Sequence, residues 1–357
     1  MVTTPHELLL YCRPGFEPDL AAELADKTSR IGWHGESQFA PGTGFLRFLG
    51  PPDEPINALQ RALPLTSLVF ARQSLVALSP LTLTREDRLS PIVEQVVESG
   101  WNFESIWQET PDTNDGKALS GLIKALERPL ASLLKKRKAL RRKAGARRLH
   151  VLWSAGDRVQ LGMSFPGNRS EAPGGIRRLR FPHGAPSRST LKLEEAWHEF
   201  VPRDEWEDRL GEGMQAADLG AAPGGWTWQL VNRGMNVYAI DNGPMDKSLM
   251  ASGLVEHRRE DGFVWKPPCR LDWLVCDIVD RPTRVVEMVE RWLVQRWCRE
   301  AIFNLKLPMR QRWWQVNDCL AGLEASLHEA GIPAALSCRH LYHDREEVTV
   351  HVRLLDA

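Results

Sequence analysis

The sequence predicts an α/β protein whose C-terminal half is a Rossmann-like domain and whose N-terminal half is an α+β region. From residue 189 onward, apolar runs of strand length alternate regularly with helical patterns. The stretch AADLGAAPGGWT at 216–227 has the composition of a strand, a tight glycine-containing loop and a helix start. Basic residues are concentrated between residues 117 and 180, outside this regular alternation.

Residues 1–82 are expected to form a small α+β domain. The run ELLLYC indicates a strand, and FEPDLAAELADKTSRIG has the period of an amphipathic helix that ends at a glycine. The same reasoning gives the order strand 7–12, helix 16–32, strand 44–50, helix 54–63 and strand 68–78.

Residues 83–166 are expected to form a second, basic unit. The patterns predict helices at 87–100 and 117–145, an extended segment at 105–113, and a hairpin at 149–164 that turns near Gly156 and Asp157. The next residues, 167–188, are rich in Gly, Pro and Arg, which is typical of a linker or basic loop.

Residues 189–357 are expected to form a mostly parallel sheet that ends in an antiparallel hairpin. Two strand patterns with a short connection, IPAALSCRHLYH and EVTVHVRLL, predict that hairpin. The parallel strands are predicted at 214–219, 236–240, 273–276 and 301–307, with helices after Gly225, Pro282 and Pro308.

The charge of the chain is unevenly distributed. Its formal net charge is zero, but 17 Lys and Arg residues stand against three acids between Lys117 and Arg180, so this segment carries +14 and the rest −14. Such an asymmetry indicates a polyanionic partner, whose phosphates basic side chains would contact. The predicted contacts are Lys135, Lys136, Arg137, Lys138, Arg141, Arg142, Lys143, Arg147, Arg148, Arg177, Arg178 and Arg180.

The glycine-containing loop indicates a nucleoside ligand without a pyrophosphate. Its spacing is G-x-x-x-G-G, which lacks the middle glycine of a dinucleotide-binding loop and the Gly-Lys-Ser/Thr of a P-loop. The next strand ends in Asp241, an acid suited to ribose hydroxyls, and the helix start at Gly225 favours a carboxylate. S-adenosylmethionine has these parts. A nicotinamide oxidoreductase is an alternative that the missing glycine disfavours.

The loop DLGAAPGGWT resembles that of the RrmJ/FtsJ-like 2'-O-ribose RNA methyltransferases, over the whole C-terminal half. The opening LLLYCRPGFEPDLAAELAD and the basic segment after it resemble the ferredoxin-like and THUMP arrangement of RNA-modifying enzymes. Together the halves resemble bacterial enzymes that methylate a cytidine ribose in 23S ribosomal RNA. The resemblance implies a class I methyltransferase fold, S-adenosylmethionine as cofactor, and 23S ribosomal RNA or a pre-ribosomal intermediate as partner.

The Lys-Asp-Lys-Glu tetrad of these methyltransferases matches Lys192, Asp277, Lys306 and Glu347 in order and local setting. The resemblance implies that Lys306 is the general base, that Asp277 orients it near the methyl group, and that the other two position the ribose. Glu346 is an adjacent alternative on the opposite face of its strand. The implied cofactor contacts are Ser189, Ala222, Pro223, Gly224, Gly225, Asp241, Asp261 and Asp277.

Other partners are not expected. No run of 18 apolar residues exists, which argues against a membrane span. His340 and His343 lack a third ligand, so no metal is predicted. We expect a cytoplasmic monomer. Trp313 or Trp314 either stacks on an unpaired base or packs a helix onto the sheet. An RNA-binding protein with an inactive methyltransferase fold is the second alternative to the enzyme.

Overall fold

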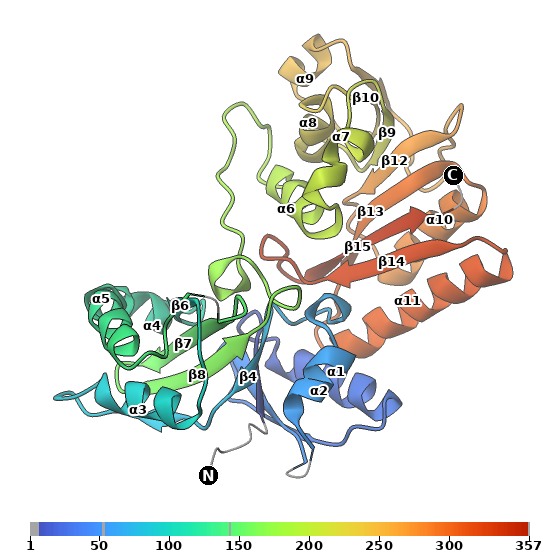
Figure 1. Ribbon diagram of the computed structural model, residues 1–357. Helices are drawn as coiled ribbons and strands as arrows, with labels where there is room; N and C mark the ends of the chain where they lie inside the picture. Colours follow the sequence, from blue (N-terminus) through green and yellow to red (C-terminus); the bar gives the residue numbers. More distant parts are fainter. Residues whose placement is uncertain (1–6, 52–53, 143, 356–357) are drawn as a thin grey trace. The chain divides into compact units, whose positions relative to one another are not determined.

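Figure 1 shows a computed structural model of the chain, which describes residues 7–51, 54–142 and 144–355. The described residues form two compact units, of which the first ends at Arg177 and the second begins at Arg178. None of the helices in these ranges has both the length and the apolar character that are needed to cross a lipid bilayer.

Unit 1 is built on one eight-stranded sheet with the order β2-β3-β1-β4-β8-β7-β6, with β5 pairing β8. β4 pairs with β8, so the sheet runs through both N-terminal domains predicted from the sequence. The division between residues 82 and 83 therefore stays a prediction. The strands are β1 Glu7–Tyr11, β2 Glu36–Gln38, β3 Phe45–Leu49, β4 Gln73–Ala77, β5 Leu81–Thr82, β6 Ser105–Glu109, β7 Arg148–Ala155 and β8 Arg158–Ser164.

The helical part of the basic segment in unit 1 is shorter than the sequence pattern predicted. The helix predicted at 117–145 is divided into α4 and α5, and α5 ends at Lys136. The chain turns at Arg137 and Lys138, which has φ 61°, and Phe103 then forms backbone hydrogen bonds with Ala139 and Arg141, both 2.8 Å, which hold these residues off the helix. The α-helices are α1 Glu17–Arg30, α2 Ile56–Ala62, α3 Ser90–Glu98, α4 Asn114–Ala118 and α5 Ser120–Lys136, and a 3-10 turn follows at Pro173–Gly175.

Unit 2 contains a seven-stranded sheet with the order β11-β10-β9-β12-β13-β15-β14. Its first five strands are parallel, and β15 pairs antiparallel with both β13 and β14. The predicted mostly parallel sheet with a terminal hairpin is therefore confirmed. The strands are β9 Gln215–Leu219, β10 Asn236–Ile240, β11 Val255–Arg258, β12 Leu271–Cys276, β13 Cys298–Lys306, β14 Ala334–Arg339 and β15 Glu347–Leu354. The sequence analysis missed β11.

Helices cover both faces of this sheet (Figure 1). α6 and α8 contact each other on one face, and α10 and α11 contact each other on the other. Side chains of period two from the strands meet α6 and α8 in a core that includes Trp197, Trp226 and Trp273. The helices are α6 Thr190–Phe200, α7 Trp206–Arg209, α8 Gly225–Val231, α9 Lys247–Ala251, α10 Pro282–Val294 and α11 Arg312–Glu329.

Candidate active site

The candidate active site lies at the carboxyl ends of β9 and β12, where the strand order of the sheet reverses. β10 and β11 extend the sheet on one side of β9, whereas β12 and β13 extend it on the other. Open α/β sheets bind ligands in the crevice at such a point. β9 and β12 are parallel neighbours with Leu219 beside Cys276, so the loop 220–225 and Asp277 begin side by side.

The loop between β9 and α8 requires glycine at two positions. Gly224 has φ 118°, a left-handed conformation, and a Cβ there would lie 2.3 Å from the Leu249 side chain. At Gly225, the first residue of α8, a Cβ would lie 2.1 Å from the hydroxyl oxygen of Ser189. The two glycines therefore let the loop lie directly against α9 and the residue before α6.

The carboxylate of Asp241, just after β10, fastens this loop. Its Oδ2 accepts a hydrogen bond from the Ala222 N–H at 3.0 Å, and its Oδ1 accepts one from the Gly243 N–H at 2.7 Å. The peptide bond between Ala222 and Pro223 is cis. Each carboxylate oxygen can accept a further hydrogen bond, so Asp241 is fixed beside the loop and can still accept from hydroxyl groups.

Asp218, in β9, is a buried carboxyl that the sequence analysis did not single out. Thr227 donates a hydrogen bond of 2.6 Å to its Oδ2, while its Oδ1 has no hydrogen-bond partner among the described residues. Burial raises the pKa of Asp218 to about 7; the Thr227 hydrogen bond opposes this, and the charges of Asp277 and Asp241 add to it. Asp218 thus lies close to two other carboxyl groups at the strand ends, and of the three it has the least complete set of donors.

Three of the four side chains that the resemblance assigned to catalysis are in direct contact. Lys192, in the first turn of α6, places its Nζ 3.0 and 3.2 Å from the two carboxylate oxygens of Asp277. The same nitrogen lies 2.5 Å from Oε1 of Glu347. All three side chains are mostly buried, with 16 or 17% of their surface exposed.

The fourth, Lys306, is the last residue of β13 and lies directly opposite Glu347 in the antiparallel pair with β15. Side chains of such a pair project from the same face with Cβ atoms about 5 Å apart. Asn304, two residues earlier, donates a hydrogen bond of 2.8 Å to Oδ1 of Asp277, so Lys306 shares the face that carries the site. No hydrogen bond or ion pair within the described ranges occupies its exposed ammonium group.

The surroundings of Lys192 keep it charged. Burial lowers its pKa, but the nearby carboxylates of Asp277 and Glu347 outweigh burial, and the net shift is upward. A lysine that holds its proton more tightly than usual cannot accept one at neutral pH. Lys192 is therefore placed to hold the two acids in position and to neutralise their charge.

Two residues beyond the predicted tetrad belong to the same cluster. Asn304 and Thr349 are buried polar residues on neighbouring strands, and their side chains are 2.9 Å apart. A sequence signal existed for the first of them, because Asn304 interrupts the apolar run AIFNLK. Thr349 had none, since threonine is common in strands.

Other predicted positions differ in their surroundings. Ser189 makes no side-chain capping bond to α6, and its hydroxyl lies 3.0 Å from that of Ser187. Asp261 is exposed and accepts a hydrogen bond from the Phe263 N–H at 2.8 Å, which closes a turn. Glu346 lies in the bend just before β15, and its carboxylate pairs with Arg312 of α11 at 2.9 Å.

The two tryptophans considered for base stacking differ in exposure, and the two histidines considered for metal binding each have a partner within the protein. Trp313 is 2% exposed and packs within the core, whereas Trp314 is 47% exposed at the start of α11. His343 lies 2.6 Å from a carboxylate oxygen of Glu195, and His340 lies 3.1 Å from a backbone carbonyl. The described part of the chain holds no group of three or more His, Cys, Asp or Glu side chains that could bind a metal ion.

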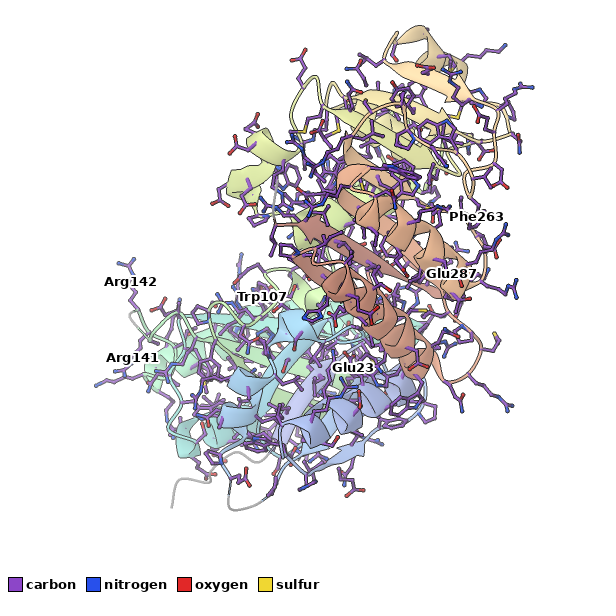
Figure 2. The ribbon with its side chains drawn as sticks, turned by 90° about the vertical axis from the view of Figure 1, so that its right-hand side faces the viewer. Glu23, Trp107, Arg141, Arg142, Phe263 and Glu287 are labelled. Atoms are coloured by element: carbon purple, nitrogen blue, oxygen red, sulfur yellow. The ribbon has the colours of Figure 1, made fainter. Side chains whose placement is uncertain are left out.

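The predicted basic surface is mostly exposed. Figure 2 shows Arg141 and Arg142 extending away from the ribbon. Arg148 differs from them: it is 9% exposed, and its guanidinium stacks 3.5 Å from the centre of the Trp107 ring and pairs with Glu171. Lys143 lies outside the described residues. Arg147 is half-buried, and the exposed members are Lys135, Lys136, Arg137, Lys138, Arg141, Arg142, Arg177, Arg178 and Arg180.

Three family models match the chain: the RlmM ferredoxin-like domain over residues 6–75, the N-terminal domain of ribosomal RNA large subunit methyltransferase M over 87–165, and FtsJ-like methyltransferase over 185–288. A protein of Chromohalobacter salexigens with the name ribosomal RNA large subunit methyltransferase M is 70% identical over 100% of both chains. One of the same name from a Marinomonas species is 50% identical over 96% of this chain and 98% of its own. The chain belongs to the ribosomal RNA large subunit methyltransferase M family.

Membership of the methyltransferase M family confirms the predicted fold class, in which an FtsJ-like methyltransferase domain follows a ferredoxin-like N-terminal region along the chain. It also confirms S-adenosylmethionine as the cofactor and ribosomal RNA of the large subunit as the substrate class. The oxidoreductase and inactive-fold alternatives are therefore wrong.

Proposed function

We propose that this methyltransferase M family member transfers a methyl group to the ribose 2'-hydroxyl of a cytidine in 23S ribosomal RNA, with Lys306 as the general base. The observation that carries the proposal is the convergence of Lys192, Asp277 and Glu347 at the switch point, with Lys306 opposite Glu347 on the same face. The cytidine and the 23S substrate rest on the family resemblance. The same substrate would place the enzyme in the cytoplasm, where bacterial ribosomes are assembled.

The residues at the strand ends suit the cofactor. S-adenosylmethionine supplies an activated methyl group on a cationic sulfonium, together with an ammonium, a carboxylate and a ribose. The convergence of Asp218, Asp241 and Asp277 favours a cation, and the unpaired Oδ1 of Asp218 is a buried acceptor that lacks a donor. Asp241 would receive the ribose hydroxyls, and the loop 222–225 would lie along the amino acid part. Asp261 stays a predicted cofactor contact.

The four side chains of the tetrad would have different roles in activating and positioning the ribose 2'-hydroxyl. A ribose hydroxyl attacks efficiently only when it is held in line with the methyl group and loses its proton in the transition state. Lys306, the one lysine of the cluster without a bound carboxylate in the described structure, would take that proton. Lys192 would stay charged and hold Asp277 and Glu347, which in turn would position the ribose and Lys306.

Unit 1 would bind the same RNA through its exposed cations. Phosphate contacts position a nucleic acid without reading its sequence, so this surface would supply affinity rather than site selection. Eight of the exposed or half-buried cations described above belong to unit 1 and suit that role, while Arg178 and Arg180 stand at the start of unit 2. A monomer would suffice, since each proposed catalytic side chain comes from one chain.

The proposal is tested with radiolabelled S-adenosylmethionine and 23S ribosomal RNA from a strain that lacks the corresponding enzyme. The wild type should form 2'-O-methylcytidine, identified by nucleoside mass spectrometry. Lys306→Ala should reduce turnover by about 100-fold or more, the usual range for loss of a general base. Lys247→Ala, which removes an exposed lysine of α9, is the matched control and should retain activity.

Two results would contradict parts of the proposal. Label on a base rather than on a ribose would reject the 2'-hydroxyl as acceptor. Equal turnover by the wild type and Lys306→Ala, with ribose methylation intact, would remove Lys306 from the role of base while leaving the acceptor assigned.

A further inference from the structure

A chain of buried polar side chains leads from the catalytic cluster into the interior of unit 2. Asp277 accepts a hydrogen bond from the Asn304 amide at 2.8 Å, and the Asn304 carbonyl oxygen lies 2.9 Å from the hydroxyl of Thr349. That hydroxyl is also 2.9 Å from Oδ2 of Asp344. Asn304 is 3% exposed, while Thr349 and Asp344 are fully buried.

The direction of each hydrogen bond follows from the kinds of atoms that meet. The Asp277 carboxylate only accepts, so the side of Asn304 that faces it must be the NH2 group. The opposite orientation would place two oxygens 2.8 Å apart without a proton between them. The carbonyl oxygen of Asn304 therefore faces Thr349 and can only accept, which requires the single hydroxyl proton of Thr349.

The remaining contact then lacks a donor unless Asp344 supplies it. Thr349 has used its proton on Asn304, so its oxygen can only accept from Oδ2 of Asp344. A protonated carboxyl oxygen can donate to Thr349 and still accept the backbone N–H of Leu341, which lies 3.0 Å away. We propose that Asp344 is a neutral carboxylic acid in the working enzyme, and that its proton orients Thr349 and Asn304 so that they position Asp277.

The charges around Asp344 agree with a neutral acid. Burial raises the pKa of Asp344 well above its ordinary value, and the negative charges of Glu347 and Glu195 add to this. The Leu341 N–H and the Lys192 ammonium act in the opposite direction. The nearby imidazole of His343 is engaged by Glu195 at 2.6 Å.

The chain would act on catalysis through the orientation of one amide. With Thr349 and Asp344 in place, Asn304 has one favourable orientation, and Asp277 receives a donor from it in addition to Lys192. Loss of the Thr349 hydroxyl would leave the buried Asn304 carbonyl oxygen without its donor, so the amide would be held less firmly against Asp277. Thr349, Asn304 and Asp344 are therefore positioning residues, and this kinetic role depends on the proposed function.

The first test compares Thr349→Val with Thr349→Ser. Valine keeps the shape but removes the hydroxyl, so we expect kcat to fall about 10-fold with the Kd for S-adenosylmethionine unchanged. Serine restores the hydroxyl and should restore kcat to within about twofold of the wild type. Thr28→Val, which removes a buried hydroxyl of unit 1 that bonds the Leu24 carbonyl, is the control and should retain kcat. Wild-type kcat in Thr349→Val would overturn the proposal.

The second test measures the protonation state of Asp344 directly and does not depend on enzyme activity. Carbon-13 NMR of carboxyl-labelled wild-type protein, with the Asp344 signal assigned by its loss in Asp344→Asn, should show a protonated carboxyl at pH 7. An ionised Asp344 at pH 7 would overturn the inference. If the wild type methylated a base instead of a ribose, the proposed function would fail, while the NMR result would still decide the state of Asp344.

Discussion

Two buried carboxyl groups, Glu109 in unit 1 and Asp218 in unit 2, have opposite surroundings. In unit 1, Glu109 is 5% exposed and accepts hydrogen bonds from Tyr11 at 3.0 Å, from His150 at 2.8 Å and from the Gly174 N–H at 2.6 Å. Burial by itself would raise its pKa, but His150 and the other donors outweigh burial and lower it. In unit 2, Asp218 is 1% exposed and has one side-chain donor, and its pKa is raised to about 7.

The number of hydrogen-bond donors distinguishes Glu109, which has a structural role, from Asp218, which can still accept a hydrogen bond from a ligand. A buried carboxylate with three donors is complete without any further molecule, so Glu109 ties β1, β6 and β7 to the turn at Gly174. Asp218 is incomplete, and it lies beneath the loop proposed to hold a cationic cofactor. In the described part of unit 1, most cations of the basic segment are exposed to solvent, where a polyanion can reach them.

The largest expected effect is on the stability of unit 1. Glu109→Gln replaces one acceptor oxygen by an NH2 group that would face another donor, so unfolding free energy should fall by about 3 kcal/mol. Urea unfolding at pH 7 followed by tryptophan fluorescence measures it, and the exposed Glu98→Gln should change it by less than about 0.5 kcal/mol. An equal, small change in both variants would show that Glu109 is not a structural acid.

The lowered pKa of Glu109 also fixes the sign of its pH dependence. A carboxyl whose folded pKa lies below its unfolded value of about 4.3 contributes stability above that value and loses it as pH falls through the folded pKa. The stability difference between wild type and Glu109→Gln should therefore be largest at neutral pH and shrink on acidification below about pH 4.

Asp218→Asn should weaken the cofactor rather than the fold. It removes the negative charge at the strand ends but keeps an oxygen for the Thr227 hydroxyl, so we expect the Kd for S-adenosylmethionine to rise about 10-fold, roughly 1.4 kcal/mol. Isothermal titration calorimetry at pH 8 measures it. Asp204→Asn, at an exposed position, serves as the control. An unchanged Kd in Asp218→Asn would place this acid with Glu109 as a structural group.

The raised pKa of Asp218 predicts that this carboxyl releases a proton when the cofactor binds. Glu109, whose pKa is lowered, is already ionised at neutral pH and has no proton to release. Below about pH 7 the apo enzyme holds a proton on Asp218, and a bound cation favours its release. The Kd for S-adenosylmethionine should therefore increase about 10-fold per unit as pH falls below 7. Calorimetry at pH 6.5 in two buffers of different ionisation enthalpy counts the released protons. The wild type should release a fraction of one proton, and equal release by Asp218→Asn would assign the proton to another group.

The sequence could predict most of unit 2 because its signals are local. Apolar strand runs and the loop DLGAAPGGWT predicted the order of elements, and the ordered tetrad contained three side chains that are in contact and Lys306, which pairs with Glu347 in the sheet. β11 was missed because VEHR carries only one apolar residue at the sheet edge. The hydrogen-bonded chain of Asn304, Thr349 and Asp344 could not be predicted, because its contacts form only when β13 pairs with β15.

Unit 1 was less predictable for the same reason. Its basic helix was predicted nine residues too long, since the contacts of Phe103 that end α5 come from a distant segment. Arg148 was grouped with the exposed cations, yet it stacks on Trp107 and pairs with Glu171, and charge density alone does not reveal such burial.

The smallest expected effect concerns the exposed cations of unit 1. Arg142→Ala should weaken RNA binding by a few fold, uniformly across sequences, and lower the slope of log K against log salt by about 1, because one phosphate contact is lost. Fluorescence anisotropy with labelled ribosomal RNA fragments at several salt concentrations measures both quantities. Arg299→Ala, an exposed arginine of unit 2 that is 3.7 Å from Asp272, should leave the slope unchanged because it lies at the amino end of β13. A slope that falls equally in both variants would mean that the RNA does not distinguish the two surfaces, and the exposed cations of unit 1 would then have no special part in RNA binding.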